Sequence, residues 1–247
     1  MKKPLRIPFL IILGFAFLFQ AAWGQSRSNP VFDQMIEALG GQTFLDVKDI
    51  HTTGRFFTFS KGDLSGSDLF SDYIKFPDME RTEFGREKNK SITINKGSEG
   101  WKIEPKNDPE PQAAVQAEEF VKNFKTSFDY VLRFVVKQPQ TTIQTLPGEI
   151  IDFKRTDVVE LRDSAKNRIR FYVDRQTRFP IKMQVRRADR QGIQEELYGN
   201  WHKFQGVATP LFISRSTNGV KTMEIRAETA AYSSGLSDNL FAAPAAK

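Results

Sequence analysis

The sequence contains no cysteine and only two histidines. Without cysteine the chain has no disulfide bond, no thiolate nucleophile and no thiolate ligand for a metal. The histidines, His51 and His202, fall on predicted strands among polar side chains, without a His-Glu-x-x-His pattern or a Cys/His cluster. We therefore predict no metal site, and we expect both histidines to be structural.

Other patterns that carry chemistry are missing as well. The segment Gly62 to Gly66 is close to a nucleophile elbow, but Ser65 stands one place too late for Gly-x-Ser-x-Gly. Glu195 and Glu196 are adjacent, so on a strand they point to opposite faces and are poor partners for paired-carboxylate catalysis. The sequence thus predicts no catalytic residue and no cofactor, with a secreted hydrolase as the weaker alternative.

Long hydrophobic runs are also scarce, and the one that exists lies near the start. It extends from Phe9 to Phe19, follows three basic residues, and is followed by small residues up to Gly24. This order predicts a secretory signal peptide in residues 1–24, cleaved after Gly24, and a periplasmic or secreted protein. An uncleaved membrane anchor is the alternative, but a spanning helix needs about 20 apolar residues and this run is shorter.

The positive charge of the chain is modest once this segment is set aside. Three of the 36 basic residues belong to it, so residues 25–247 carry 33 basic and 30 acidic side chains. They contain no tight Lys/Arg cluster with interleaved aromatic residues, which is the usual footprint of a nucleic-acid site. We expect no nucleic-acid partner, while peripheral contact with an anionic lipid surface remains open.

Capping residues predict a short helix, and alternation predicts strands after it. Asn29 suits the N-cap, Pro30 the first helical position and Gly40-Gly41 the C-cap. Beyond them the hydrophobic period changes to two, and Asn218-Gly219 is a strong hairpin signal. The predicted strands are 48–60, 68–76, 79–88, 91–95, 100–103, 168–174, 181–186, 195–203, 209–217 and 220–231.

The repeated hairpins predict an antiparallel sheet with one polar face, too large to remain flat. A surface loop at 104–112, rich in proline, precedes one long amphipathic helix predicted over 113–137, whose apolar stripe the sheet should cover. The sequence therefore indicates a single α+β domain over residues 25–247, mostly β.

Phenylalanine is the abundant residue, with 22 in the chain and 18 of them in residues 25–247. Aromatic side chains supply much apolar area, either to a packed core or to a ligand cavity, and both interpretations remain open. For Trp101 and Trp201 the competing interpretation is core packing with a satisfied indole N–H. The lid and wall candidates for a cavity are Phe120, Phe124, Phe128, Trp101 and Phe57.

Several short patterns, taken in order, resemble the periplasmic outer-membrane lipoprotein-sorting proteins of the LolA/LolB-like superfamily. Each pattern is short, so the resemblance rests on their order along nearly all of residues 25–247. The patterns are Leu39-Gly40-Gly41, Pro77-Asp78-Met79-Glu80-Arg81, Gly97 with Gly100-Trp101, Asp174 with Thr177 and Pro180-Ile181, Trp201, Gly206-Val207, Pro210, Leu240-Phe241 and Pro244.

The resemblance implies a curved antiparallel half-barrel sheet whose concave face is covered by helices. It also implies an apolar cavity for acyl chains of lipids or lipoproteins, used without catalysis in outer-membrane lipoprotein sorting. The family's gating arginine is not assigned to Arg55, and neither Glu104–Gln112 nor Arg186-Arg187 has a counterpart in the family pattern. The alternative is an envelope protein-interaction or stress-sensing module on the same fold, with a protein partner and no lipid cargo.

Overall fold

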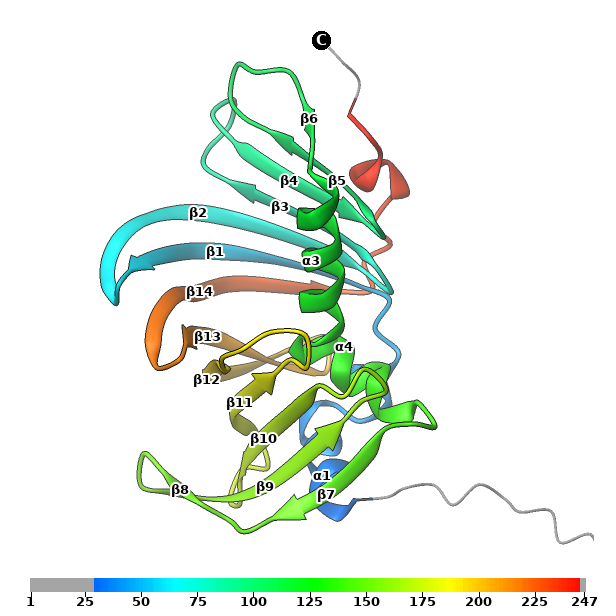
Figure 1. Cartoon of the computed structure of the whole chain (residues 1–247), viewed down its shortest axis with the longest axis vertical. Helices are drawn as coiled ribbons and strands as arrows, with labels where there is room; N and C mark the ends of the chain where they lie inside the picture. Colours follow the sequence, from blue (N-terminus) through cyan, green and yellow to red (C-terminus); the bar gives the residue numbers. More distant parts are fainter. Residues whose placement is uncertain (1–28, 245–247) are drawn as a thin grey trace, which may run out of the picture.

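A computed structural model describes residues 29–244 of the chain, so the predicted signal peptide lies outside the described residues. These residues form one antiparallel sheet that is curved and not closed into a barrel, with helices on its concave face (Figure 1). The strand order is β6-β5-β4-β3-β2-β1-β14-β13-β12-β11-β10-β9-β7, and β8 pairs with β9. The predicted fold class is confirmed.

The sheet consists of two meanders, the upper and lower halves of Figure 1. The first contains β1 (Asp49–Ser60), β2 (Asp63–Lys75), β3 (Met79–Phe84), β4 (Ser91–Lys96), β5 (Glu99–Ile103) and β6 (Glu110–Pro111). The second contains β7 (Thr142–Leu146), β8 (Ile150–Ile151), β9 (Lys154–Arg162), β10 (Arg168–Asp174), β11 (Pro180–Arg186), β12 (Gln194–Phe204), β13 (Val207–Thr217) and β14 (Val220–Tyr232).

The first and last strands along the chain, β1 and β14, lie side by side and join the two meanders. β1 pairs with β14 in antiparallel register, from Ile50 opposite Tyr232 to Thr58 opposite Met223, and the register shifts between Thr53 and Gly54. The junction between the two meanders therefore lies in the middle of the sheet rather than at an edge.

The helices are short. They are α1 (Pro30–Leu39), α2 (Gln42–Leu45), α3 (Ala114–Lys125), α4 (Phe128–Arg133) and the 3-10 turns η1 (Val135–Lys137) and η2 (Asp238–Phe241). The predicted cap of α1 is present, since the Asn29 side chain accepts hydrogen bonds from the amides of Val31 at 3.1 Å and Phe32 at 3.3 Å. No helix within residues 29–244 has the length and apolar character needed to cross a membrane.

The single helix predicted over 113–137 is wrong, because the structure breaks it at Thr126 and Ser127. The Thr126 hydroxyl donates to the carbonyl oxygens of Lys122 and Asn123, both at 3.1 Å, in place of a continued helical ladder. Side-chain hydroxyls of this kind compete with the backbone pattern of a helix. The break lets α4 turn away from α3 and enter the core.

Three details of the strands also differ from the sequence analysis. The pairing of β7 with β9 was not predicted. The strand predicted over 68–76 begins earlier, because β2 starts at Asp63 and its turn with β1 is at Lys61-Gly62. The strand predicted over 79–88 ends at Phe84, where Gly85 takes a positive φ of 101°.

The C-terminal segment covers the outer face of β3 and β4 through η2. Asp49, at the start of β1, holds this segment because its buried carboxylate accepts hydrogen bonds from the amides of Ser234, Gly235 and Leu236. Phe241 of η2 is fully buried. The outer face is thus covered at this point by the chain itself.

Candidate functional site

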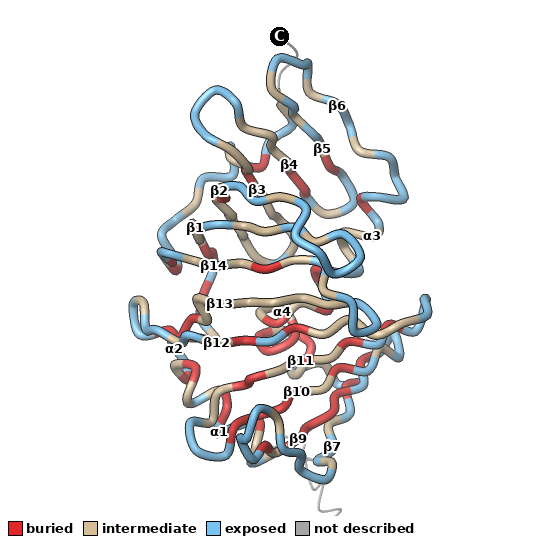
Figure 2. Tube along the Cα trace, turned by 90° about the vertical axis from the view of Figure 1, so that its left-hand side faces the viewer, coloured by how far each residue is buried: buried red, intermediate tan, exposed pale blue. Residues whose placement is uncertain are grey.

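The concave inner face of the sheet is filled in the lower half of the molecule. Helices α1, α2 and α4 pack there against β9 to β13 in one continuous core. The ring of Phe128, at the start of α4, lies 6.2 Å from that of Phe171 and 5.0 Å from that of Tyr198. Figure 2 shows buried positions concentrated in these strands and in α4. Space for a ligand must therefore be sought in the upper half.

On the inner face of the upper half, apolar side chains are left partly exposed. The ring of Phe56 in β1 lies 5.0 Å from that of Phe84 in β3, and neither belongs to a packed cluster of the described residues. Strand pairing puts three further apolar residues on the same face. We call this surface the hollow, and it is lined by Phe56, Phe70, Phe84, Met223 and Ile225.

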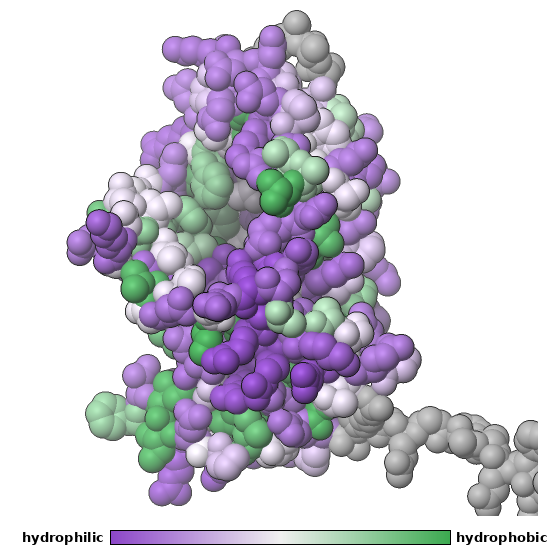
Figure 3. Space-filling model, in the orientation of Figure 1, coloured by the Kyte–Doolittle hydropathy of each residue, from purple (hydrophilic) through white to green (hydrophobic). Residues whose placement is uncertain are grey.

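Helix α3 crosses the strands of the upper half (Figure 1) and packs on β5 and α4. An open groove of about 460 Å³ lies between α3 and the inner face of β4 and β5. Phe120 and Val115 line it from the helix, while Asn95 and Lys102 line it from the strands. Figure 3 shows a recess beside α3 with hydrophobic surface at its depth. We infer that α3 forms a roof over one side of the hollow.

A cluster of charged side chains ties this roof to the loop between β11 and β12. Arg187, whose side chain is 3% exposed, donates to Glu119 of α3, with Nη2 at 3.0 Å from Oε2, and to Asp189, with Nη2 at 2.6 Å from Oδ2. Arg190 donates to Glu119 at 2.8 Å, and Lys122 lies 3.0 Å from Asp189. Hydrogen bonds from Arg187 lower the pKa of both carboxyls. We call this cluster the α3 latch.

A polar group, in which Glu196 is buried and Arg215 is partly exposed, separates the hollow from the packed core. Arg215 of β13 donates from Nε to the Glu196 carboxylate of β12 at 2.7 Å, and the Tyr198 hydroxyl donates to the same carboxylate at 2.6 Å. Burial raises the pKa of Tyr198 well above its usual value, so the hydroxyl keeps its proton. Because a buried charge is costly unless it is paired and hydrogen-bonded, this neutral pair offers no free charge to a ligand.

Two recessed carboxyls lie on the inner face of β2 and β3. Burial raises the pKa of Asp72 to about 6. The Thr82 hydroxyl donates a hydrogen bond to this carboxylate at 2.9 Å, which acts in the opposite direction and lowers the pKa. Burial and the nearby charge of Asp72 raise the pKa of Glu80 to about 8, although Arg215 opposes the shift. Glu80 is therefore protonated at neutral pH, which lowers the charge inside the hollow.

The predicted lid residues take three different positions. Phe120 lines the groove, as stated above. Phe124 is buried between the rings of Phe76, at 6.1 Å, and Phe120, at 5.3 Å. Phe128 belongs to the packed core. The break after Lys125 separates Phe128 from the stripe on α3, so only Phe120 still faces open space.

The predicted wall residues lie on the outer face of the sheet. Lys102 lines the groove, so Trp101, the residue before it on β5, points to the opposite face, beside Ile94 of β4. Phe57 pairs with Glu224 of β14, and the guanidinium of Arg226 lies 5.2 Å from its ring. Phe56, one residue earlier, faces the hollow instead. Arg55, flanked by Gly54 and Phe56, also lies on the outer face.

The two histidines and Trp201 have different surroundings in the structure. His51 stacks on Tyr73 with ring centroids 4.2 Å apart, and burial lowers its pKa. His202 is exposed beside Asn200. Trp201 stacks on Phe179 at the edge of the core, but its indole nitrogen is buried without a hydrogen-bond partner among the described residues. Within residues 29–244 no three acidic or histidine side chains are grouped to hold a metal ion.

The class of fold defined by this arrangement is the LolA-like curved sheet with helices on its concave face. No family model matches the sequence. No curated protein matches it either.

Solved structures confirm the resemblance at the level of the fold. A DUF1329 family protein from Desulfovibrio piger is similar with a TM-score of 0.60 and 13% identity, over 86% of this chain and 95% of that one. A domain assigned to the outer membrane lipoprotein-sorting proteins, from Vibrio parahaemolyticus, gives 0.56 and 12%, over 85% and 95%. A LolA superfamily protein from Nitrosomonas europaea gives 0.53 and 14%, over 86% and 96%.

Proposed function

We propose that the protein is a non-enzymatic carrier that binds acyl chains of lipids or lipoproteins in the hollow. One observation supports this most directly: Phe56, Phe84, Met223 and Ile225 are partly exposed on a concave face and belong to neither packed cluster. Contiguous apolar surface left uncovered in a concavity is typical of a binding site. The acyl chain would enter the hollow through the open groove beside α3.

The energetics of such a site need no charged contact. Burial of one methylene group contributes about 0.8 kcal/mol, so ten methylenes contribute about 8 kcal/mol before the cost of association. The charges near the hollow are compatible with this cargo, since Glu196 and Arg215 neutralise one another and Glu80 is protonated at pH 7. Asp72, whose pKa is raised only to about 6, stays ionised at pH 7, so these groups place a single negative charge beside the acyl chain.

The setting we propose is the periplasm, after removal of residues 1–24. The predicted signal peptide supports export, and the names of two structural neighbours refer to lipoprotein sorting or to the LolA superfamily. A role in outer-membrane lipoprotein sorting is the specific form of the proposal.

Adjacent phenylalanines on opposite faces provide a direct test. We expect Phe56→Ser to weaken binding of a fluorescent fatty acid about tenfold or more, because burying a phenylalanine side chain is worth about 1.5–3 kcal/mol. Phe57→Ser is the matched control, since it removes the same side chain from the outer face, and it should change the affinity by less than about twofold. Phe120→Ala should weaken binding from the roof.

Native mass spectrometry of gently purified protein supplies the independent measurement. We expect retained lipid in the wild type and less in Phe56→Ser. Protein that is persistently empty and ignores fatty-acid probes would contradict the proposal. Pull-down from envelope extract with that empty protein would then test the alternative, a module that binds a protein partner.

A further inference from the structure

Three arginines lie side by side on the outer face of the lower half. Arg168 of β10 is directly paired with Arg162 of β9 on one side and with Arg186 of β11 on the other. Residues directly opposite on antiparallel strands have Cβ atoms about 4.5–5.5 Å apart, and like charges there destabilise the sheet. A row of three such residues across three strands therefore costs stability in the absence of a counter-charge.

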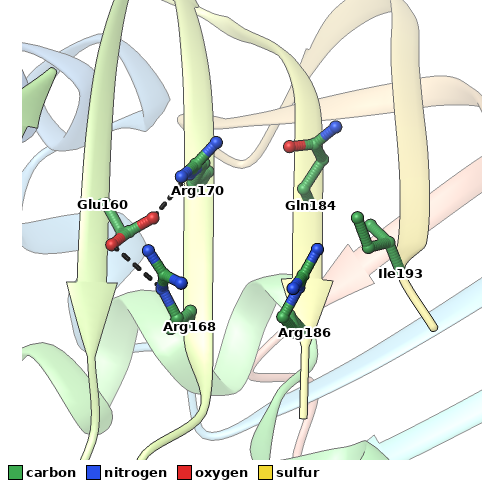
Figure 4. Close-up of a pocket in the computed structure, with 6 residues that line it drawn as sticks. All are labelled: Glu160, Arg168, Arg170, Gln184, Arg186 and Ile193. Carbon is green, nitrogen blue, oxygen red and sulfur yellow. Dashed lines mark hydrogen bonds and ion pairs between the residues drawn. The ribbon is translucent and has the colours of Figure 1, made fainter. Parts of the chain in front are cut away.

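The protein itself supplies only part of that counter-charge. Glu160, which is 4% exposed, accepts from Arg170 at 2.5 Å and from Arg168 at 3.3 Å (Figure 4). Arg162 and Arg186 are exposed, and neither forms an ion pair within residues 29–244. One carboxylate thus serves two arginines and leaves the ends of the row uncompensated.

These side chains surround a small pocket. It has a volume of about 110 Å³ and is lined by Glu160, Arg168, Arg170, Gln184, Arg186 and Ile193. This volume corresponds to roughly four water molecules at about 30 Å³ each, which suits one tetrahedral oxyanion. In Figure 4, Arg168 and Arg186 lie on adjacent strands at the same end of the pocket. Guanidinium groups recognise phosphate oxygens through paired N–H donors.

The pocket continues into a shallow groove of about 510 Å³ along the β11–β12 loop, which shares Arg168, Arg186 and Ile193 with it. The groove adds Lys166 and also Arg190, which is paired with Glu119 in the α3 latch, and it has no carboxylate among its lining residues. Figure 3 shows the strongly hydrophilic surface that gathers over this part of the molecule. A ligand larger than one oxyanion could therefore extend along the groove toward Lys166, whereas Arg187 and Arg190 are already paired with Glu119.

We propose that this arginine groove binds a phosphate-bearing anion, with the phosphate in the small pocket between Arg168 and Arg186. The site lies on the outer face and is separate from the hollow, so it does not depend on the acyl-carrier function. The same chemistry is offered by a phospholipid head group and by a soluble phosphate compound. The experiment below distinguishes these two sources.

The probe for the chemistry is inorganic pyrophosphate, measured by isothermal titration calorimetry on the full chain. The test variant is Arg162→Gln with Arg186→Gln, and the matched control is Lys61→Gln with Lys106→Gln, two exposed turn residues whose replacement removes the same charge. We expect at least a tenfold loss of pyrophosphate affinity in the arginine variant and less than a twofold change in the control. Binding of the wild type should weaken as salt is added.

Thermal unfolding gives a second readout that needs no ligand. The arginine variant should melt at a higher temperature than the wild type, because it relieves the repulsion along the row, whereas the control should melt unchanged. Pyrophosphate should raise the melting temperature of the wild type and leave that of the arginine variant in place. A higher melting temperature also shows that the variant folds.

Vesicle flotation identifies the source of the phosphate. Binding to vesicles that contain phosphatidylglycerol, absent with phosphatidylcholine alone and displaced by pyrophosphate, supports a head group. Pyrophosphate binding without vesicle binding supports a soluble ligand. Absence of pyrophosphate binding, or an equal loss in the arginine variant and the lysine control, would overturn the proposal.

Discussion

Arg187 and Glu119 join the roof of the hollow to the sheet, since the buried guanidinium of a β-hairpin loop holds a carboxylate on α3 through two hydrogen bonds. The two residues are 68 positions apart in the sequence. The contact fixes a helix that otherwise packs mainly on β5 and α4. The position of α3 therefore depends on a few charged groups as well as on apolar contacts.

We expect Glu119→Gln to loosen α3. The change removes the carboxylate that Arg187 and Arg190 share, and charged hydrogen bonds of this partly exposed kind contribute on the order of 1 kcal/mol. Amide hydrogen exchange in residues 114–125 should accelerate about fivefold. The neighbouring Glu118→Gln is the control, since Glu118 is exposed. Equal exchange rates in the two variants would show that the latch does not restrain the helix.

The recessed carboxyls make stability fall as pH rises. The pKa of Glu80 is about 8 and that of Asp72 about 6 in the folded protein, whereas unfolded carboxyls titrate near pH 4. The folded state therefore binds more protons than the unfolded state between about pH 4 and pH 8, so the free energy of unfolding decreases across this window.

Glu80→Gln should flatten this dependence, because the amide cannot ionise. Urea unfolding at pH 5, 7 and 9 measures the slope, and carbon-13 NMR titration of the carboxyls measures both midpoints. The exposed Glu99→Gln on β5 is the control and should keep the wild-type slope. A slope that survives in Glu80→Gln would assign the effect to other groups.

Arg133 is the largest fully buried side chain, and we expect its loss to be costly. Its guanidinium lies 3.9 Å from the ring centroid of Phe44, donates from Nε to the Phe44 carbonyl oxygen at 2.9 Å and pairs with Asp129. Arg133→Ala should lower the free energy of unfolding by about 3–5 kcal/mol, because it leaves Asp129 without its partner and opens a cavity.

Chemical denaturation of Arg133→Ala and Lys137→Ala makes this comparison. Lys137 is an exposed cation one turn further along the chain, and its replacement should cost less than about 0.5 kcal/mol. Similar losses in the two variants would mean that the buried arginine contributes no more than a surface cation.

Gly54 is required where β14 bulges against β1, because the register between the two strands skips Glu228. A Cβ atom at this position would lie 2.2 Å from the Arg226 carbonyl oxygen and 2.7 Å from the Ala227 Cα, both of which are backbone atoms. Gly54→Ala should therefore destabilise the protein by about 1–3 kcal/mol in thermal or chemical unfolding. Gly66→Ala is the control, because its Cβ would meet only the Thr58 hydroxyl, at 3.0 Å. A neutral Gly54→Ala would mean that the strands separate easily there.

The sequence predicted the elements whose signals are local. The caps of α1 and the alternation of the second meander correspond to observed elements. β9 was not predicted from the sequence, because it is buried on both faces. Val158 and Glu160 are buried on the outer face, and Val159 and Leu161 belong to the core. A strand of this kind lacks the alternation that reveals half-buried strands.

The candidate site was harder to predict because it depends on which face of each strand is the inner one. Phe56 and Phe57 are adjacent and identical, so the sequence does not show which of them faces inward. Only the pairing of β1 with β14 puts Phe56 in the hollow. A shift of one residue exchanges the two faces of a strand. The row of three arginines also depends on register, although Arg186-Arg187 was already unusual in the sequence.

The position of β1 beside β14 has a consequence for biogenesis. Ile50 pairs with Tyr232, 182 positions further along the chain, so the junction between the meanders can form only after residues 220–232 have been synthesised. Contacts at such long separation slow folding, because the loop must be closed before the contact is made. Until then β1 presents an unpaired edge to its surroundings, and a nascent chain at this stage needs protection from aggregation.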